Sequence, residues 1–229
     1  MWWPFYDTTW FIILPALFFT MWAQSRVQST YHRYARVYAR SGMTGAQVAR
    51  RLLDEAGLYD IPVQQVHGHL ADHFDPRARV IRLSAGVYQS TSLAALGIAA
   101  HETGHALQHA EGYIPLAFRN NIFPLANIGS RAAFPLFFIG LFFGGLHQLM
   151  TVGIFLFAFA VLFQLVTLPV EYNASSRAIA LLAGRGFLAP DEVQPAKEVL
   201  NAAALTYLAA AAVSITQLIR LLILRDRRR

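Results

Sequence analysis

The chain has 229 residues, of which 55% are hydrophobic and 14% are charged, and it contains no cysteine. This composition is too apolar for an ordinary soluble domain and favours a membrane protein, while the lack of cysteine excludes a disulfide framework and a thiolate metal site. The formal net charge of +6 comes almost entirely from arginine, and without a basic stripe interleaved with aromatic residues it favours contact with a lipid bilayer and no nucleic acid partner.

The first apolar stretch covers residues 10–23, and all four tryptophans of the chain lie within it or beside it. With this aromatic flank it predicts a transmembrane helix, because a span requires about 20 apolar residues and tryptophan is typical of membrane interfaces. A cleaved signal peptide is the alternative, but the basic segment that begins such peptides is absent and Arg26 lies on the wrong side. We therefore expect an uncleaved N-terminal anchor.

A polar segment follows the anchor. Arginines interleave with tyrosines over residues 26–40, which predicts either the positive flank that keeps this end inside the cell or a helix lying on the membrane surface. Thr44 and Gln47 have the spacing of a capping box, and we expect them to begin a short amphipathic helix that Gly57 ends.

Three short β-like runs come next, with a proline-containing turn before the last of them. They cover residues 61–66, 68–74 and 79–83. His67, His69 and His73 lie in this region. Because only alternate residues of a strand share a face, we interpret these histidines as surface or supporting residues rather than metal ligands.

A helix with two histidines is the main chemical signal. The apolar run at residues 93–100 leads into it, with serines before the run that can cap its start and a glycine after the histidines that can stop it. His101 and His105 are four positions apart, so a helix stacks them on one face as a two-point metal clamp. Glu102 can reach a water in the open position of this clamp, which is the arrangement of a metallopeptidase.

The chain returns to apolar sequence after this helix. Residues 123–146 can cross the membrane if Ser130 and Arg131 lie near the inner end, where an arginine side chain can extend to the headgroups. Residues 149–170 form a second clear span, so the two stretches predict a transmembrane hairpin. Residues 202–224 are a further candidate, which gives three to four transmembrane helices in all.

A third ligand decides whether the two histidines bind a metal, because a surface helix with two unrelated histidines is the alternative. Without cysteine, this ligand has to be a histidine or a carboxylate. Glu171 follows the second hairpin helix directly, and a hairpin that crosses and returns brings it to the membrane side of His101 and His105. We therefore expect Glu171 to complete the site close to the lipid headgroups.

Seven blocks of the sequence carry a resemblance to a known family. They lie at residues 22–24, 41–45, 72–76, 101–108, 126–130, 167–174 and 201–212. With them, the chain resembles the YugP-type neutral zinc metallopeptidases of bacterial membranes over nearly its whole length. The resemblance implies a small membrane-embedded peptidase related to the gluzincins. It also implies that His101, His105 and Glu171 bind one Zn²⁺ and that Glu102 is the general base.

The expected fold is an α-helical membrane protein with a small α+β, gluzincin-like zinc-peptidase domain. It has five predicted segments. They are an N-terminal transmembrane anchor (residues 1–25), a membrane-proximal catalytic domain (26–121), a transmembrane helical hairpin (122–170), a third-ligand helix with its connector (171–200), and a C-terminal transmembrane helix with a basic tail (201–229). Residues 80–83 are expected either to present a strand edge to an extended substrate backbone or to form an ordinary strand of the sheet.

One position departs from the wider group of gluzincins, many of which have an aspartate four residues after the ligand glutamate to orient a histidine. Here that position is Ser175, which brings no charge, so the support of the histidines is weaker or comes from elsewhere. Asn173 and Asp72 are the candidates for that support. The oxyanion of the reaction also needs a donor. Its candidates are Arg177, Tyr172, His73 and His109.

The expected function is that of a zinc metalloendopeptidase that hydrolyses peptide bonds at the membrane surface. Its partners are then the lipid bilayer and membrane or membrane-associated protein substrates. A catalytically silent membrane scaffold that retains a structural zinc site is the alternative, although such a scaffold has no need of Glu102. A transporter is disfavoured because little charge lies inside the spans.

The resemblance implies a multi-pass protein of the bacterial inner membrane, and the distribution of arginines predicts that its catalytic side lies in the cytoplasm. The basic tail at residues 225–229 conflicts with this orientation, because a last crossing would place it outside the cell. Three explanations stay open: the last stretch does not fully cross, the tail is tolerated outside, or the orientation is inverted.

Overall fold

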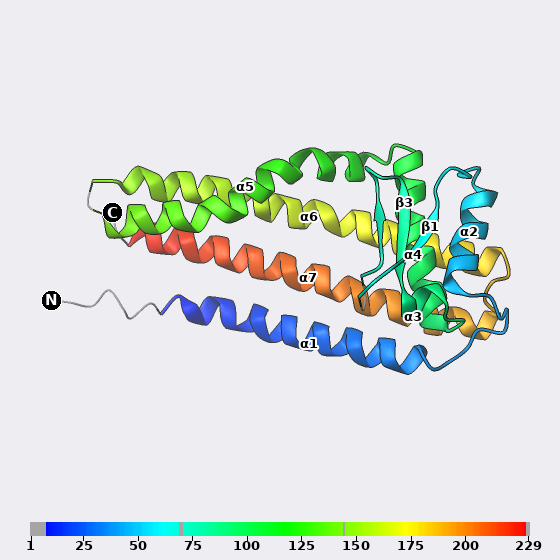
Figure 1. Ribbon diagram of the computed structural model, residues 1–229. Coiled ribbons are helices and arrows are strands. Elements are labelled where there is room, and N and C mark those ends of the chain that lie inside the picture. Colours follow the sequence, from blue (N-terminus) through cyan, green and yellow to red (C-terminus); the bar gives the residue numbers. More distant parts are fainter. Residues whose placement is uncertain (1–7, 69–70, 144, 228–229) are drawn as a thin grey trace. The chain divides into compact units, whose positions relative to one another are not determined.

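The computed structural model describes residues 8–68, 71–143 and 145–227. The start of the predicted anchor, His69 and the last two arginines of the basic tail lie outside the described residues. The helices are α1 (Trp10–Tyr34), α2 (Gly45–Glu55), α3 (Ala85–Tyr88), α4 (Leu93–Ala110), α5 (Ile114–Phe142), α6 (His147–Gly184) and α7 (Pro190–Asp226). The strands are β1 (Val63–Val66), β2 (His73–Asp75) and β3 (Val80–Ser84) (Figure 1).

The chain divides into two compact units, and α1, α5, α6 and α7 contribute residues to both. Unit 1 comprises Met1–Gln24, Ala117–Leu168 and Thr206–Arg229, and unit 2 comprises Ser25–Leu116 and Pro169–Leu205. The described elements of unit 1 are helical, whereas the sheet and helices α2 to α4 belong to unit 2. All the predicted metal-site residues fall within unit 2.

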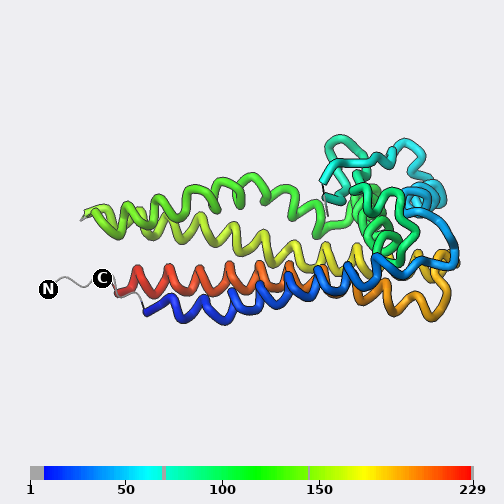
Figure 2. The backbone as a smooth tube through the Cα atoms, turned by 60° about the horizontal axis from the view of Figure 1, so that its bottom comes forward, coloured from blue at the N-terminus to red at the C-terminus, as the bar shows by residue number. Residues whose placement is uncertain are grey.

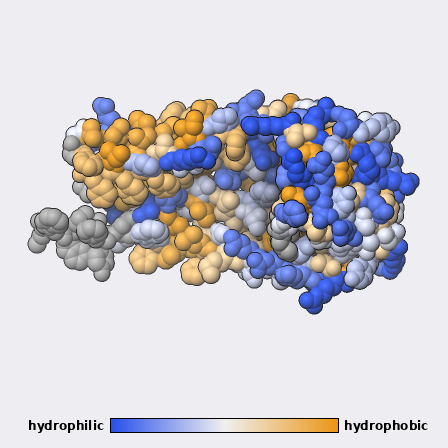
Figure 3. All heavy atoms as spheres, viewed as in Figure 1, coloured by the Kyte–Doolittle hydropathy of each residue, from blue (hydrophilic) through white to orange (hydrophobic). Residues whose placement is uncertain are grey.

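Four helices in the described part of the chain are long and apolar enough to cross a membrane, namely α1, α5, α6 and α7. Hydrophobic side chains gather over the helices of unit 1 on the face shown in Figure 3. The helices extend beyond the predicted spans: α6 continues through Glu171 to Gly184, and α7 begins at Pro190. Apolar sequence indicates where a helix can cross a bilayer and does not indicate where the helix ends.

Helices α5 and α6 pack closely within unit 1 (Figure 2). A Cβ atom on Gly153 would lie 2.6 Å from the carbonyl oxygen of Ala133, so only glycine permits this backbone approach, as is typical of transmembrane helix pairs. The expectation that Ser130 and Arg131 lie near the inner end of the span stays a prediction. Because α5 begins well before the predicted span, both residues lie well inside the helix, with exposed side chains.

Arg220 interrupts the last apolar stretch, and its side chain is buried within unit 1. Its Nε atom donates a hydrogen bond of 3.1 Å to Thr9 Oγ1, and its guanidinium lies 4.2 Å from the ring centroid of Trp10. A hydrogen bond and a cation–π contact both offset the cost of an arginine in an apolar helix. Arg220 therefore does not prevent α7 from crossing a membrane.

The small sheet of unit 2 has the strand order β1-β3-β2, with β1 parallel and β2 antiparallel to β3. Of the two interpretations of residues 80–83, the edge strand is therefore wrong, because β3 is the central strand. Val80, Ile81 and Leu83 are buried, as expected for a strand that is covered on both faces. Strand β2 lies at one edge of the sheet, with Phe74 opposite Ile81.

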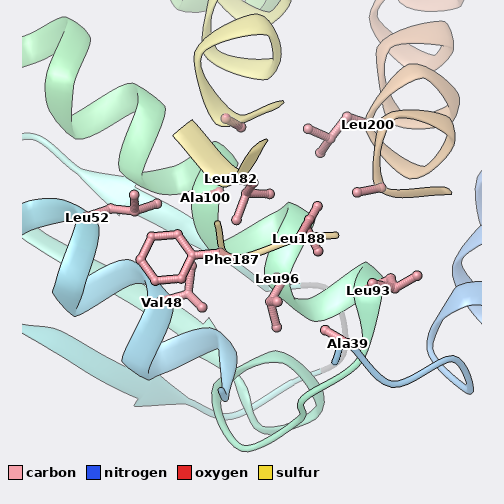
Figure 4. Packing of buried hydrophobic residues seen from close by; sticks show 12 residues of the cluster. Ala39, Val48, Leu52, Leu93, Leu96, Ala100, Leu182, Phe187, Leu188 and Leu200 are labelled. Carbon is pink, nitrogen blue, oxygen red and sulfur yellow. The ribbon is translucent and has the colours of Figure 1, made fainter. Parts of the chain in front are cut away.

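Two hydrophobic clusters hold α4 in unit 2. One packs Ala99 of α4 against Ile81 of the sheet. The other packs Leu96 of α4 against Leu182 of α6 and Phe187, as Figure 4 shows. Full burial of each large apolar side chain stabilises the fold by roughly 1.5–3 kcal/mol. Within unit 2, this packing fixes α4 relative to both the sheet and the last part of α6.

Candidate metal centre

Helix α4 carries the predicted clamp, and its ends are those that the sequence indicates. Ser92 is the N-cap, with its hydroxyl accepting a hydrogen bond of 3.2 Å from the Ala95 N–H. Gly112 follows the helix with a φ of +66°, a conformation that favours glycine. His101 and His105 lie one turn apart with ring centroids separated by 4.7 Å. The local sequence thus brings two imidazoles to the same face of one helix.

Glu171 of α6 lies against the two histidines. Its Oε2 atom is 3.2 Å from His101 Nε2 and 3.4 Å from His105 Nε2, and the two Nε2 atoms are 3.1 Å apart. Tetrahedral zinc with ligand bonds of about 2.0–2.1 Å requires its ligand atoms to be about 3.3 Å from one another. The three residues therefore match the spacing of a zinc site with three protein ligands, the number typical of catalytic zinc.

Buried carboxylates make this site negative. Glu171 is 4% exposed and Glu102 is 8% exposed. Burial lowers the pKa of His105, but the hydrogen bond that His105 donates to Glu171 and the charges of Glu102 and Glu171 outweigh this effect, so the pKa is raised above its ordinary value. The surroundings of His105 therefore favour a positive charge, which a bound metal cation would supply.

Glu102 lies on α4 next to the first histidine and is held by the sheet. Its Oε2 atom accepts a hydrogen bond of 2.9 Å from the backbone N–H of Phe74, in edge strand β2. A backbone donor orients a buried carboxylate without placing a second charged group beside it. The sheet therefore fixes the direction of this carboxylate.

Two uncharged side chains lie within hydrogen-bond distance of the Nδ1 atoms of the histidines. Ser175 Oγ lies 3.1 Å from His101 Nδ1, and Gln108 Oε1 lies 3.0 Å from His105 Nδ1. Gln108 is not among the residues predicted from sequence. Its position three residues after His105 is the signal that identifies it, because side chains at i and i+3 of a helix are neighbours.

Asn173 and Arg177 lie beside Gln108. The Oδ1 atom of Asn173 accepts hydrogen bonds from Gln108 Nε2 at 2.9 Å and from Arg177 Nε at 2.8 Å. Arg177 also pairs with Glu111 at 2.7 Å. These contacts connect Asn173 to His105 through Gln108. Tyr172, by contrast, is 45% exposed.

Asp72 and His73 make their contacts elsewhere in unit 2. Asp72 accepts hydrogen bonds from both the backbone N–H and the hydroxyl of Ser84. The exposed His73 has its Nδ1 atom 2.8 Å from the carbonyl oxygen two residues before it. The ring of His109 lies 5.8 Å from that of Phe74. These contacts join Asp72 and His73 to the segment around the sheet rather than to the three ligand residues.

Comparisons with known proteins agree with this geometry. A family model described as "Putative neutral zinc metallopeptidase" matches residues 9–226. The "Putative membrane protease YugP" of Bacillus subtilis (strain 168) is 50% identical to this chain over 210 residues, which cover 92% of this chain and 93% of the relative. No solved structure is significantly similar to the chain.

Gly104 provides a test of how the two helices of the candidate metal centre meet. A Cβ atom at this position would lie 2.7 Å from the carbonyl oxygen of Ala174, three residues after Glu171. We expect Gly104→Ala to push α4 away from α6 and to weaken zinc binding by at least about tenfold, the lower end of the loss typical of a disturbed ligand environment, measured by competition with a chelator. Gly97→Ala is the control on the same helix, because its Cβ would lie 3.7 Å from the nearest atom. Equal zinc affinities for the two variants would contradict this account.

Proposed function

Because the chain belongs to the family of neutral zinc metallopeptidases, we propose that it is a membrane-embedded zinc endopeptidase with a gluzincin-like catalytic domain. We propose that it hydrolyses peptide bonds at the membrane surface. One observation carries the proposal: the Nε2 atoms of His101 and His105 and the Oε2 atom of Glu171 form a triangle with sides of 3.1–3.4 Å. Glu102 extends from the same helix as the histidines.

His101, His105 and Glu171 would hold one zinc ion. Bound zinc polarises a peptide carbonyl and lowers the pKa of water towards about 7. The donor set supports this assignment, since two imidazoles and one carboxylate are typical of catalytic zinc.

Glu102 acts as the general base in this proposal. It takes a proton from the attacking water and delivers it to the leaving amine. The Phe74 N–H already occupies Oε2 of Glu102, so Oε1 is the oxygen that carries the proton between the two steps. A carboxylate whose direction is fixed beforehand does not have to reorganise during the reaction.

Edge strand β2 is the surface along which we propose that an extended substrate lies. Backbone pairing with a sheet edge holds a chain of any sequence in an extended form. Two observations support this placement: β2 occupies one end of the order β1-β3-β2, and its Phe74 N–H reaches the proposed base. The substrates would be membrane or membrane-associated proteins, because Glu171 follows the apolar part of α6 directly.

The protein is a membrane protein, and we propose that it resides in the bacterial inner membrane with its catalytic side in the cytoplasm. The arginines that follow the first apolar stretch support this orientation. Four crossings place both chain ends on the opposite side, so the basic tail would be tolerated outside the cytoplasm.

Replacement of the proposed base gives the first test. We expect Glu102→Gln to reduce cleavage of an unfolded membrane-protein substrate by about 10²–10⁴-fold, the usual contribution of general acid–base catalysis, while bound zinc is unchanged. Purified variants are compared at zinc contents verified by elemental analysis, with Glu55→Gln on α2 as a control. Full activity of Glu102→Gln would end the assignment of the base. Inactive wild-type protein that holds zinc would favour the structural-zinc scaffold.

Removal of the third ligand tests the metal site itself. We expect Glu171→Ala to weaken zinc binding by more than about 100-fold, because replacing a ligand costs more than replacing its supporting partner. A chelator competition titration measures this loss, and the same chelator should stop cleavage by the wild type. Zinc affinity at the wild-type level in Glu171→Ala would place the metal elsewhere.

Orientation is testable because the natural chain has no cysteine. We expect Tyr59→Cys, at a position 75% exposed in unit 2, to resist a membrane-impermeant thiol reagent in intact cells and to react after permeabilisation. His147→Cys, at the start of α6, should react in intact cells. The reverse pattern would show that the catalytic side faces outward.

A further inference from the structure

The side chain of Gln108 is buried, and both its NH₂ group and its amide oxygen make hydrogen bonds. It is 0% exposed on α4. Its Nε2 atom donates hydrogen bonds of 2.8 Å to the carbonyl oxygen of Val170 and of 2.9 Å to Asn173 Oδ1. Its Oε1 atom lies 3.0 Å from Nδ1 of His105. The amide therefore connects a proposed zinc ligand to the segment of α6 that follows the membrane-crossing part.

The direction of these hydrogen bonds is determined by Arg177, the residue at the other end of this series of contacts. A guanidinium can only donate hydrogen bonds, and Arg177 Nε donates to Asn173 at 2.8 Å. The atom of Asn173 that receives this bond therefore has to be its oxygen. The same oxygen accepts the hydrogen bond from Gln108, so Gln108 has to direct its NH₂ group towards Asn173. Val170 supplies a second acceptor that requires the same orientation.

The orientation of Gln108 in turn determines where His105 carries its hydrogen. The Gln108 oxygen facing Nδ1 can only accept, so Nδ1 has to donate. In the neutral imidazole, Nε2 then holds the lone pair that a metal needs. His101 differs in this respect, because the Ser175 hydroxyl beside its Nδ1 atom can either donate or accept.

We propose that Arg177, Asn173 and Gln108 form a hydrogen-bond relay that places the hydrogen of His105 on Nδ1 and so presents Nε2 to zinc. The inference rests on the metal site proposed above. The three relay residues are positioning residues, since they act through His105. Arg177 is itself fixed by its ion pair with Glu111 at 2.7 Å and by contact with the ring of Tyr113 at 5.9 Å.

A pair of isosteric changes separates this relay from simple packing. Asn173→Asp and Gln108→Glu each replace one NH₂ group by oxygen, so each adds one negative charge at nearly unchanged volume. In Asn173→Asp, the new carboxylate still accepts from both Arg177 and Gln108, so the relay keeps its direction. In Gln108→Glu, the new carboxylate instead presents oxygen to the oxygens of Val170 and Asn173, and acceptors then meet without a hydrogen between them.

We therefore expect Gln108→Glu to weaken zinc binding by about 10–100-fold, the range typical of lost support around a metal ligand, and Asn173→Asp to stay within about threefold of wild type. Chelator competition measures zinc affinity, and the absorption spectrum of the cobalt-substituted protein reports the ligand geometry. The negative charge that Gln108→Glu introduces would by itself attract the cation, so a loss of affinity cannot arise from charge alone. Wild-type affinity in Gln108→Glu, or equal losses in both variants, would overturn the relay.

Arg177→Met tests the relay from its other end, and it also serves if Gln108→Glu does not fold. It removes the donor that fixes Asn173, and we expect zinc binding to weaken by about two- to tenfold, less than in Gln108→Glu. Glu111→Gln is its control, because it removes the ion pair and leaves the hydrogen bond from Arg177 to Asn173. Unchanged affinity in Arg177→Met would contradict the inference. Failure of the metal site itself is distinguishable, because wild-type protein and Glu171→Ala would then bind zinc alike.

Discussion

The contact between α4 and α6 at Gly104 is the constraint on which the candidate metal centre depends. Imidazole and carboxylate side chains are short, so ligand atoms about 3.3 Å apart require their backbones to be close. The lack of a side chain at Gly104 lets α4 approach the carbonyl of Ala174, and the cluster around Leu96 and Leu182 holds the two helices together. Hydrophobic packing thus supplies the precision that the site needs.

Polar groups around this contact are arranged before any substrate arrives. Among the described residues, no buried side-chain nitrogen or oxygen atom lacks a hydrogen-bond partner. The sheet contributes the Phe74 N–H to Glu102, and α6 contributes both the proposed ligand Glu171 and Ser175, which contacts Nδ1 of His101. Such a site does not need to reorganise its dipoles when charge develops in a reaction.

Sequence predicts the parts of this centre that depend on local geometry. The spacing of His101 and His105 and the Ser92 cap concern residues within about one turn of a helix. The expectation that Glu171 lies near the two histidines follows from the order of the apolar stretches. The central position of β3 and the contact of Gln108 with Asn173 depend on how distant segments pack, which hydrophobic periodicity does not determine.

Charge balance explains why uncharged side chains support both histidines. The buried acidic groups next to the histidines are Glu171 and Glu102, and together they would match the two positive charges of one zinc ion. A carboxylate in the place of Gln108 or Ser175 would add a further buried negative charge, which costs free energy as long as no cation is bound. The positive charge of Arg177 is already balanced by Glu111, so the proposed relay would convey a hydrogen-bond direction to the site and no net charge.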